Sequence, residues 1–187
     1  MFSTTDFRKG LKIEIEGEPY VIIECQHVKP GKGVAFVKTK YKSLLTGRVL
    51  ERNFRSGDKV SQPNIEERKM QYLYMDGEGY IFMDQGSYDQ ISIMAEAMED
   101  ALPYLMDSLE VSVLFFNGKA INVDLPTFLN LTVTYTEPGF KGDTATGVTK
   151  PATVETNASF QVPLYVKEGD IIKIDTRTGS FVERVRT

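Results

Sequence analysis

The string Lys29-Pro30-Gly31-Lys32-Gly33 places a lysine where the backbone is restrained. Pro30 and Gly31 fit the two central positions of a type II turn, because proline presets φ near about −65° and glycine accepts the positive φ that follows. Gly33 adds one more permissive dihedral angle, so we expect a hairpin loop of roughly three to five residues. Lys32 would then present its ammonium group at the end of a stiff loop, as a positive charge directed at a partner.

Residues that would mark an enzyme or a metal site are sparse. The single histidine is His27 and the single cysteine is Cys25, which excludes an internal disulfide and a Cys-rich zinc site. We interpret His27 as a support that packs against or hydrogen-bonds the hairpin base, with structural filler as the alternative, and Cys25 as a small buried hydrophobe. Asp84 and Asp89 are spaced like solvated turn charges, so we predict no catalytic residue, metal or cofactor.

Two predicted strands, at residues 21–28 and 34–41, position the loop. Lys38, Lys40 and Lys42 recur at period two, which places three ammonium groups on one face of the second strand. We interpret these lysines as a basic stripe that leads away from the loop and contacts an RNA backbone.

The charge distribution is uneven, although the net charge of −4 argues on average against a nucleic-acid partner. Residues 1–64 carry 12 Lys/Arg against 7 Asp/Glu, residues 65–126 carry 3 against 12, and residues 127–187 carry 7 against 7. The first third can therefore lie against a phosphate backbone that repels the middle third, which would orient binding. The alternative is that each third is only solvated by its own charges.

We predict an all-β chain of three small barrels. In residues 1–64, short half-apolar strands and the hairpin around Lys32 indicate an antiparallel barrel, which buries such strands without open edges. The charge balance changes sign near residues 61–64, where we place the first boundary.

Residues 65–126 and 127–187 are predicted to form two further barrels of similar size. In the second segment, Asp100 is the predicted N-cap of a short helix near residues 101–107. The strands predicted in this second segment are 72–75, 80–83, 110–116 and 120–123. The strands predicted in the third segment are 128–133, 159–166, 171–175 and 181–185. A Gly/Thr/Pro-rich stretch at 137–153 is longer than an ordinary connection and is therefore expected to be mobile or functional.

The composition is that of a globular protein, with 41% hydrophobic and 26% charged residues. The first ten residues have no apolar core of a signal peptide, and no run approaches the roughly 18 apolar residues of a membrane span. We therefore expect a cytoplasmic protein that does not contact membranes, in agreement with its single cysteine.

The loop and several later strings resemble a known family. The string His27-Val28-Lys29-Pro30-Gly31-Lys32-Gly33-Val34-Ala35-Phe36 resembles the modification loop of bacterial elongation factor P, with Lys32 in the place of the modified lysine. The resemblance covers the whole chain, through Tyr72-Leu73-Tyr74, Pro138-Gly139-Phe140-Lys141-Gly142-Asp143-Thr144, Lys150-Pro151-Ala152-Thr153 and the string from Gly169 to Gly179. It implies an N-terminal SH3-like, KOW-type barrel followed by two OB-folds in an elongated arrangement.

The resemblance implies a translation factor and not an enzyme. Such a protein binds the ribosome beside peptidyl-tRNA when synthesis stalls on consecutive prolines, and stimulates peptide-bond formation. Lys32, extended by a lysine-modifying enzyme, would position the tRNA acceptor end, while the lysine stripe contacts the tRNA backbone. Lys29 and His27 would support the loop, and we expect a monomer.

The resemblance also assigns Gly142-Asp143-Thr144 to a loop that approaches messenger RNA near the exit site. The alternative for this string is an ordinary turn made of good turn residues.

Three other hypotheses remain open. A generic RNA-binding module could use the barrels and the lysine stripe. A hydrolase could be built on Gly142-Asp143-Thr144, although the sequence offers no base, nucleophile or metal set for it. A paralogous elongation factor P-like protein is the third, and the Pro-Gly-Lys-Gly tip favours the principal factor. The sequence also leaves open whether Lys32 carries a lysyl group, another amine-bearing chain or no addition.

Overall fold

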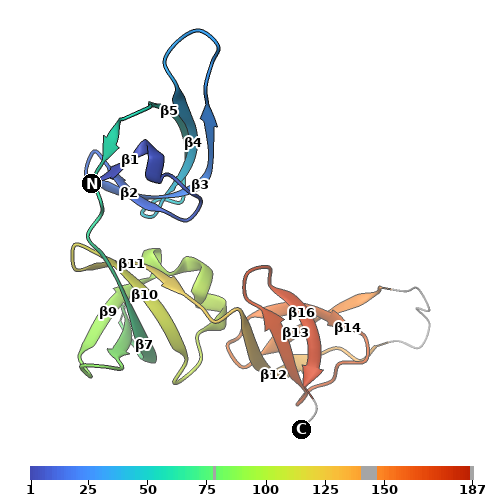
Figure 1. Cartoon of the computed structure of the whole chain (residues 1–187). Helices are drawn as coiled ribbons and strands as arrows, with labels where there is room; N and C mark the ends of the chain where they lie inside the picture. The colour runs from blue at the N-terminus through green and yellow to red at the C-terminus, as the bar shows by residue number, and fades with distance from the viewer. Residues whose placement is uncertain (78, 140–146, 186–187) are drawn as a thin grey trace. The chain divides into compact units, whose positions relative to one another are not determined.

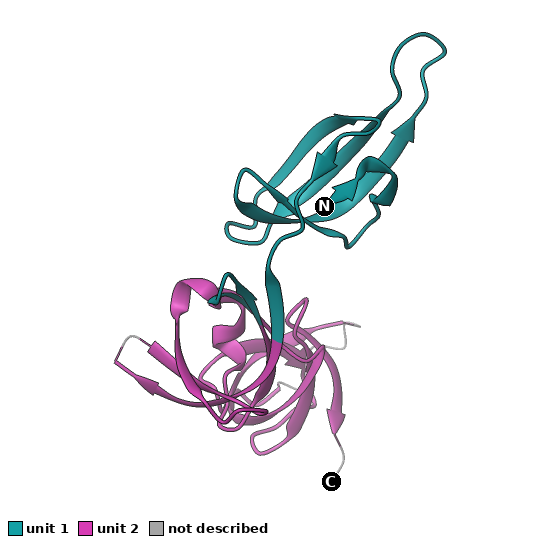
Figure 2. Ribbon diagram, turned by 60° about the vertical axis from the view of Figure 1, so that its left-hand side comes forward, with its two compact units in different colours: residues 1–67, 114–122 teal, residues 68–113, 123–187 magenta. Residues whose placement is uncertain are grey.

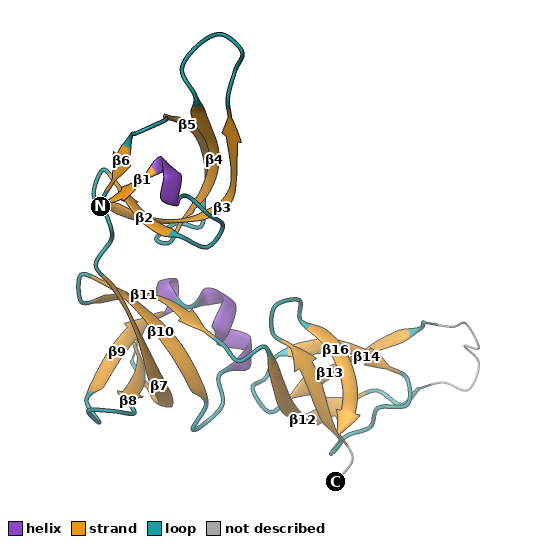
Figure 3. Cartoon of the chain, viewed as in Figure 1, coloured by secondary structure: helices purple, strands orange, loops and turns teal. Residues whose placement is uncertain are grey.

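The computed structural model describes residues 1–77, 79–139 and 147–185 of the chain. Strands predominate within these ranges, and the helices are short 3-10 segments (Figures 1 and 3). The all-β class is therefore confirmed. The chain divides into two compact units, one of residues 1–67 and 114–122 and the other of residues 68–113 and 123–187 (Figure 2).

The N-terminal part of the first unit is a small antiparallel barrel. Four strands pair in the order β2-β3-β4-β5, and β1 pairs with β6. The elements are β1 Phe2–Ser3, η1 Thr4–Asp6, β2 Lys12–Ile15, β3 Glu18–Val28, β4 Phe36–Ser43, β5 Val49–Arg55 and β6 Lys59–Val60. The short strands that the sequence predicts within residues 1–64 are thus present.

Alternation along β4 builds the core of this barrel. Val37, Thr39 and Tyr41 are buried, whereas the lysines between them are exposed. Phe54 and Tyr41 pack with further apolar side chains in one cluster, and aromatic rings meet edge to face, as Phe7 and Phe54 do with centroids 5.2 Å apart. Cys25 is half-buried against this core rather than fully buried, with its thiol 3.5 Å from the Phe7 carbonyl oxygen.

Tyr20 provides a test of the packing in this barrel. Its hydroxyl donates a hydrogen bond of 2.8 Å to the Glu18 carboxylate. That hydrogen bond, together with burial, raises the pKa of Tyr20 to about 12. Since an unfolded tyrosine has a pKa of about 10, the contribution to stability is complete below about pH 10 and is lost as the pH rises towards about 12.

We expect a late-titrating tyrosine in an ultraviolet absorbance titration of the folded protein. Glu18→Gln removes the acceptor charge, so the same phenol should titrate at lower pH in that variant. A Tyr20→Phe variant whose high-pH titration matches that of the unaltered protein would contradict the assignment.

The central strands form one five-stranded sheet in the order β11-β10-β7-β8-β9. They are β7 Ile65–Asp76, β8 Gly79–Asp84, β9 Gln90–Met94, β10 Glu110–Phe116 and β11 Lys119–Asp124. β7 begins seven residues before the strand predicted at 72–75, and β9 is absent from the sequence-based prediction. The signal for β9 is the alternation of Ile91 and Ile93 with polar neighbours, which covers only five residues.

The helix predicted near residues 101–107 is wrong in type and in bounds. The structure has two 3-10 helices, η2 Ala95–Ala97 and η3 Glu99–Tyr104. Asp100 lies in the first turn of η3, and its N-cap is Met98. Pro103 lies inside η3, and because proline lacks an N–H and its ring clashes with the preceding turn, an α-helix cannot extend through this position.

The C-terminal strands form a second five-stranded sheet in the order β14-β13-β12-β15-β16, and β14 also contacts β16. They are β12 Phe128–Thr136, β13 Thr149–Val154, β14 Ser159–Pro163, β15 Ile171–Asp175 and β16 Ser180–Val185. Their inward residues, including Leu131, Val154 and Ile172, make one apolar core. Tyr104, at the end of η3, belongs to the same core and lies 5.5 Å from Phe160 between ring centroids.

The stretch at 137–153 is only partly a connection, because β13 starts at Thr149. Lys150 in this strand is buried, and its ammonium group donates a hydrogen bond of 2.6 Å to the Glu137 carbonyl oxygen. The apolar stem of a lysine can be buried in this way when its charged end finds an acceptor.

In the part of the chain that the structure describes, no helix is long and apolar enough to cross a membrane.

Candidate functional site

The candidate site lies at the end of the hairpin formed by β3 and β4. The two strands pair from Tyr20↔Ser43 to Val28↔Phe36, with a bulge between Ile22 and Glu24. Near the end of β3 the successive residues Gln26 and His27 are both exposed, although they face opposite sides of the strand. The hairpin therefore extends beyond the barrel core, as its protruding loop in Figure 1 shows.

The loop differs from the turn that the sequence predicts. It spans residues 29–35, so the prediction of three to five loop residues is wrong, as is the strand start at residue 34. The positive φ is at Gly33, with +117°, and Gly31 is not among the residues with positive φ, so the type II turn at Pro30 and Gly31 is also wrong. A seven-residue loop reverses direction over more bonds, and only its last glycine needs a left-handed backbone.

Contacts at the base of the loop limit its width. The Ser56 N–H donates a hydrogen bond of 2.8 Å to the Ala35 carbonyl oxygen, which ties the loop end to β5. A Cβ placed on Gly33 would lie 3.7 Å from Cγ of Pro30, so these two residues approach each other. Val34 leaves its expected strand and is 69% exposed, because the barrel offers no core at this height.

Lys32 lies in this loop and is exposed to solvent. The other residues of the string, Lys29, Pro30, Gly31 and Gly33, are exposed as well. His27 is exposed on β3, where its backbone pairs with Val37. The supporting roles expected for Lys29 and His27 stay predictions.

The three lysines of the stripe lie on one face of β4, but they share it with two carboxylates. The Lys38 ammonium is 3.1 Å from a Glu51 carboxylate oxygen, and Lys40 lies between Glu24 at 3.3 Å and Glu51 at 4.0 Å. Lys42 is opposite Val21 on β3 and Val49 on β5. An RNA backbone would have to compete with these carboxylates for Lys38 and Lys40.

Glu24 and Glu51, the partners of the stripe, were not among the residues predicted for the site. Their positions follow from the pairing of β3 and β5 with β4. Counting outward from the hairpin loop would have placed Glu24 opposite Lys40, provided that the loop length was known. The pairing of Glu51 needs the register of β5, which local sequence does not encode.

Gly142, Asp143 and Thr144 lie outside the described residues. Among the described residues, no group of three or more His, Cys, Asp or Glu side chains could hold a metal ion. The arrangement around the hairpin suits contact rather than bond chemistry, since it presents an amine on a protruding loop.

Comparisons with known families and proteins agree along the whole chain. Residues 3–60 match the elongation factor P KOW-like domain, residues 65–123 match the elongation factor P OB domain, and residues 129–184 match the elongation factor P C-terminal domain. The chain is 53% identical over 184 residues to elongation factor P of Moorella thermoacetica, covering 98% of this chain and 100% of that protein. Elongation factor P of Pelotomaculum thermopropionicum is 54% identical over 185 residues, covering 99% and 100%.

Solved structures support the fold. A eukaryotic translation initiation factor 5A from Methanococcus jannaschii aligns with a TM-score of 0.52 and 24% identity, covering 65% of this chain and 92% of that one. A translation initiation factor eif-5a family protein from Naegleria fowleri aligns with a TM-score of 0.53 and 19% identity, covering 66% and 96%.

A β-barrel chain with a KOW-like and an OB domain, and with full-length relatives of this kind, is a translation elongation factor. The chain belongs to the elongation factor P family. The predicted family, and the KOW-like barrel followed by OB domains, are thus confirmed.

Proposed function

We propose that this protein binds the ribosome beside peptidyl-tRNA and stimulates peptide-bond formation where consecutive prolines stall synthesis. The observation that carries the proposal is the exposed Lys32 in a loop that protrudes from the first barrel. Family membership supports a role in elongation. The protein is not an enzyme in this proposal, and it acts in the cytoplasm as a monomer.

The physical reason for the stimulation is orientation. The ring of proline and its fixed φ disfavour the reactive arrangement of the peptidyl ester and the incoming amine. A cationic side chain that braces the tRNA acceptor end restores that arrangement and raises the rate without forming or breaking a bond. The ribosome carries out the reaction.

A lysine-modifying enzyme extends Lys32 in this proposal. All five residues of the string from Lys29 to Gly33 are exposed, which leaves the amine accessible. A longer side chain reaches farther along the acceptor end, so unmodified protein should be less active. Mass measurement of the Lys32 peptide from native cells tests this step, and an unmodified peptide from cells with active protein would contradict it.

Two further assignments belong to the same proposal. The chain is divided into domains at 1–64, 65–126 and 127–187, and Gly142-Asp143-Thr144 approaches messenger RNA near the exit site. The strands β12 and β13, which end and begin at Thr136 and Thr149, are the described elements nearest to that string.

The function is tested by translation in a reconstituted system that lacks endogenous factor. Two messengers should be compared, identical except that one encodes three consecutive prolines and the other three alanines. Added protein should increase full-length product from the proline messenger about tenfold or more and leave the alanine messenger nearly unchanged. Equal stimulation of both messengers, or of neither, would reject the proposal.

A further inference from the structure

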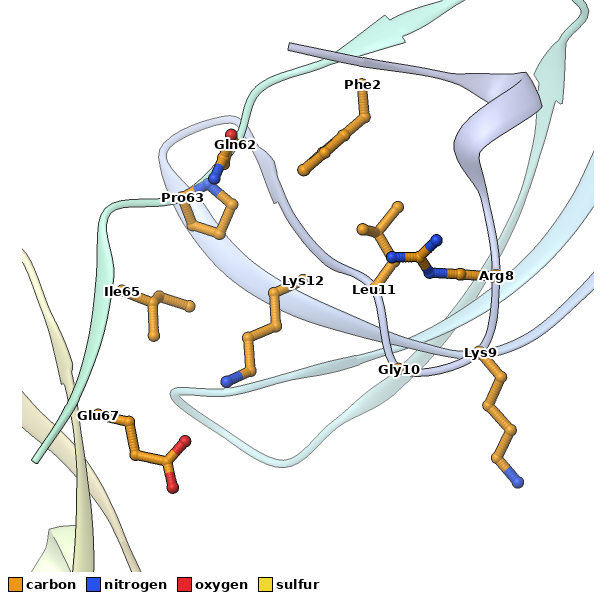
Figure 4. Close-up of a pocket in the computed structure, with 10 residues that line it drawn as sticks. All are labelled: Phe2, Arg8, Lys9, Gly10, Leu11, Lys12, Gln62, Pro63, Ile65 and Glu67. Atoms are coloured by element: carbon orange, nitrogen blue, oxygen red, sulfur yellow. The ribbon is translucent and has the colours of Figure 1, made fainter. Parts of the chain in front are cut away.

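A pocket of about 500 Å³ lies in the first unit, away from the hairpin loop. Its positively charged lining residues are Arg8, Lys9 and Lys12, and its apolar wall includes Phe2 and Leu11. Figure 4 shows the Arg8 guanidinium beside Leu11, Lys12 extending towards the opposite wall, and Lys9 pointing outward at the rim. Neither the sequence patterns nor the family comparisons assign a role to this pocket.

A short turn fixes the cations. The Leu11 N–H donates a hydrogen bond of 3.1 Å to the Arg8 carbonyl oxygen, and Gly10 has φ +87° at the third position, as a type II turn requires. The buried side chains of Phe7 and Ile13 anchor the two sides of this turn in the barrel core. Arg8 and Lys9 therefore start from a backbone that is held in place before any ligand binds.

These cations also differ from those of the lysine stripe in their charge environment. The ion pairs found among the described residues do not include Arg8, Lys9 or Lys12, whereas Lys38 and Lys40 are paired with carboxylates. Asp6, the nearest acidic residue before Arg8 in the chain, already accepts hydrogen bonds from Ser3 at 2.8 and 3.1 Å. A phosphate that entered the pocket would therefore break no ion pair of Arg8 or Lys12, although the charge of Arg8 acts on Asp6 at longer range and contributes to the lowered pKa of that carboxyl.

We propose that the pocket binds single-stranded RNA, with a phosphate held between Arg8 and Lys12 and with Lys9 adding positive charge at the rim. The apolar wall of Phe2, Leu11 and Pro63 would contact the ribose or the base of the same nucleotide. A positive groove beside an aromatic side chain is the arrangement by which proteins hold single strands without reading sequence. The proposal rests on the proposed function in one respect, since the RNA in question belongs to the ribosomal complex.

Glu67 lies on the wall opposite the turn, where its negative charge would repel a phosphate. This repulsion would favour a position of the bound phosphate close to Arg8. Removal of this charge should strengthen binding, because repulsion between like charges weakens the complex.

The test is binding of the full chain to a short fluorescent oligouridylate at several salt concentrations. Arg8→Gln/Lys12→Gln should raise the Kd about tenfold and reduce the slope of log affinity against log salt by about 0.7, the contribution of one neutralised phosphate on a single strand. Glu67→Gln should lower the Kd about two- to threefold. The matched control, Arg48→Gln/Lys59→Gln, removes one exposed arginine and one exposed lysine from the same unit and should change the Kd less than about twofold.

Unchanged affinity and salt slope in the Arg8/Lys12 variant would overturn the proposal. So would equal binding of a polyglutamate peptide with the same charge, because the ligand would then be an acidic protein segment. The Glu67→Gln result does not depend on whether the double variant folds. If the protein binds oligouridylate as expected but does not stimulate translation of the proline messenger, the proposed function is rejected and the pocket assignment stands.

Discussion

Lys32→Ala should abolish stimulation of the proline messenger while the protein still binds ribosomes. The exposed loop ends the hairpin of β3 and β4, and the hydrogen bond that ties it to the barrel is made by the Ala35 carbonyl oxygen rather than by the Lys32 side chain. The substitution therefore removes the charge and leaves the fold intact. We expect the rate of bond formation between prolines to fall about 10- to 100-fold, the size of effect that loss of a positioning contact can produce.

Lys29→Ala is the matched control, because it removes an exposed lysine from the same loop. It should reduce the rate far less, about twofold, and should weaken ribosome association to a similar degree as Lys32→Ala. Single-turnover measurement of dipeptide formation, with ribosome binding measured separately, distinguishes the two effects. Equal losses in the two variants would indicate that the loop acts only through its total charge, as in a generic RNA-binding module.

Tyr104→Ala should cause the largest loss of stability, about 3–5 kcal/mol, as is typical for removal of a buried aromatic ring. Tyr104 ends η3 and packs in the apolar core of the C-terminal strands, 5% exposed. The preceding residue contributes as well, because the Thr156 hydroxyl donates a hydrogen bond of 2.6 Å to the Pro103 carbonyl oxygen. Burial, followed by the charges of Asp175 and Asp100, raises the pKa of Tyr104.

Urea unfolding of the full chain measures this loss, and Tyr88→Ala is its control. Tyr88 is 71% exposed, so its replacement should change the free energy of unfolding by no more than about 0.5 kcal/mol. A loss below about 1 kcal/mol in Tyr104→Ala would contradict the packing of η3 against the C-terminal core. This contact also explains physically why residues 68–113 and 123–187 form one compact unit.

Most strands could be predicted because their signal is local. Alternation along β4 separates Val37 and Tyr41 from the lysines without reference to any other part of the chain. The turn between β10 and β11 has positive φ at Asn117 and Gly118, two residue types that tolerate this backbone conformation, so its signal is local as well. The helix near residue 101 failed for a different reason, since apolar spacing does not distinguish an α-helix from a 3-10 segment that contains Pro103.

The candidate site was predicted in part. The string around Lys32 indicated an exposed lysine between two strands, and that much is a property of nearby residues. The loop length and the position of the left-handed glycine were not predictable, because they depend on where the pairing of β3 and β4 stops.

Strand periodicity, the exposed lysine and the family could be read from local sequence, because each depends on residue types at short spacing. The charges that are available for binding depend instead on how distant strands pair and pack. Strand register brings Glu24 and Glu51 to the stripe, and the fold leaves Arg8 and Lys12 beside an apolar wall without such partners among the described residues. Register and packing join residues far apart in the chain, so the net charge at a surface cannot be read from local sequence.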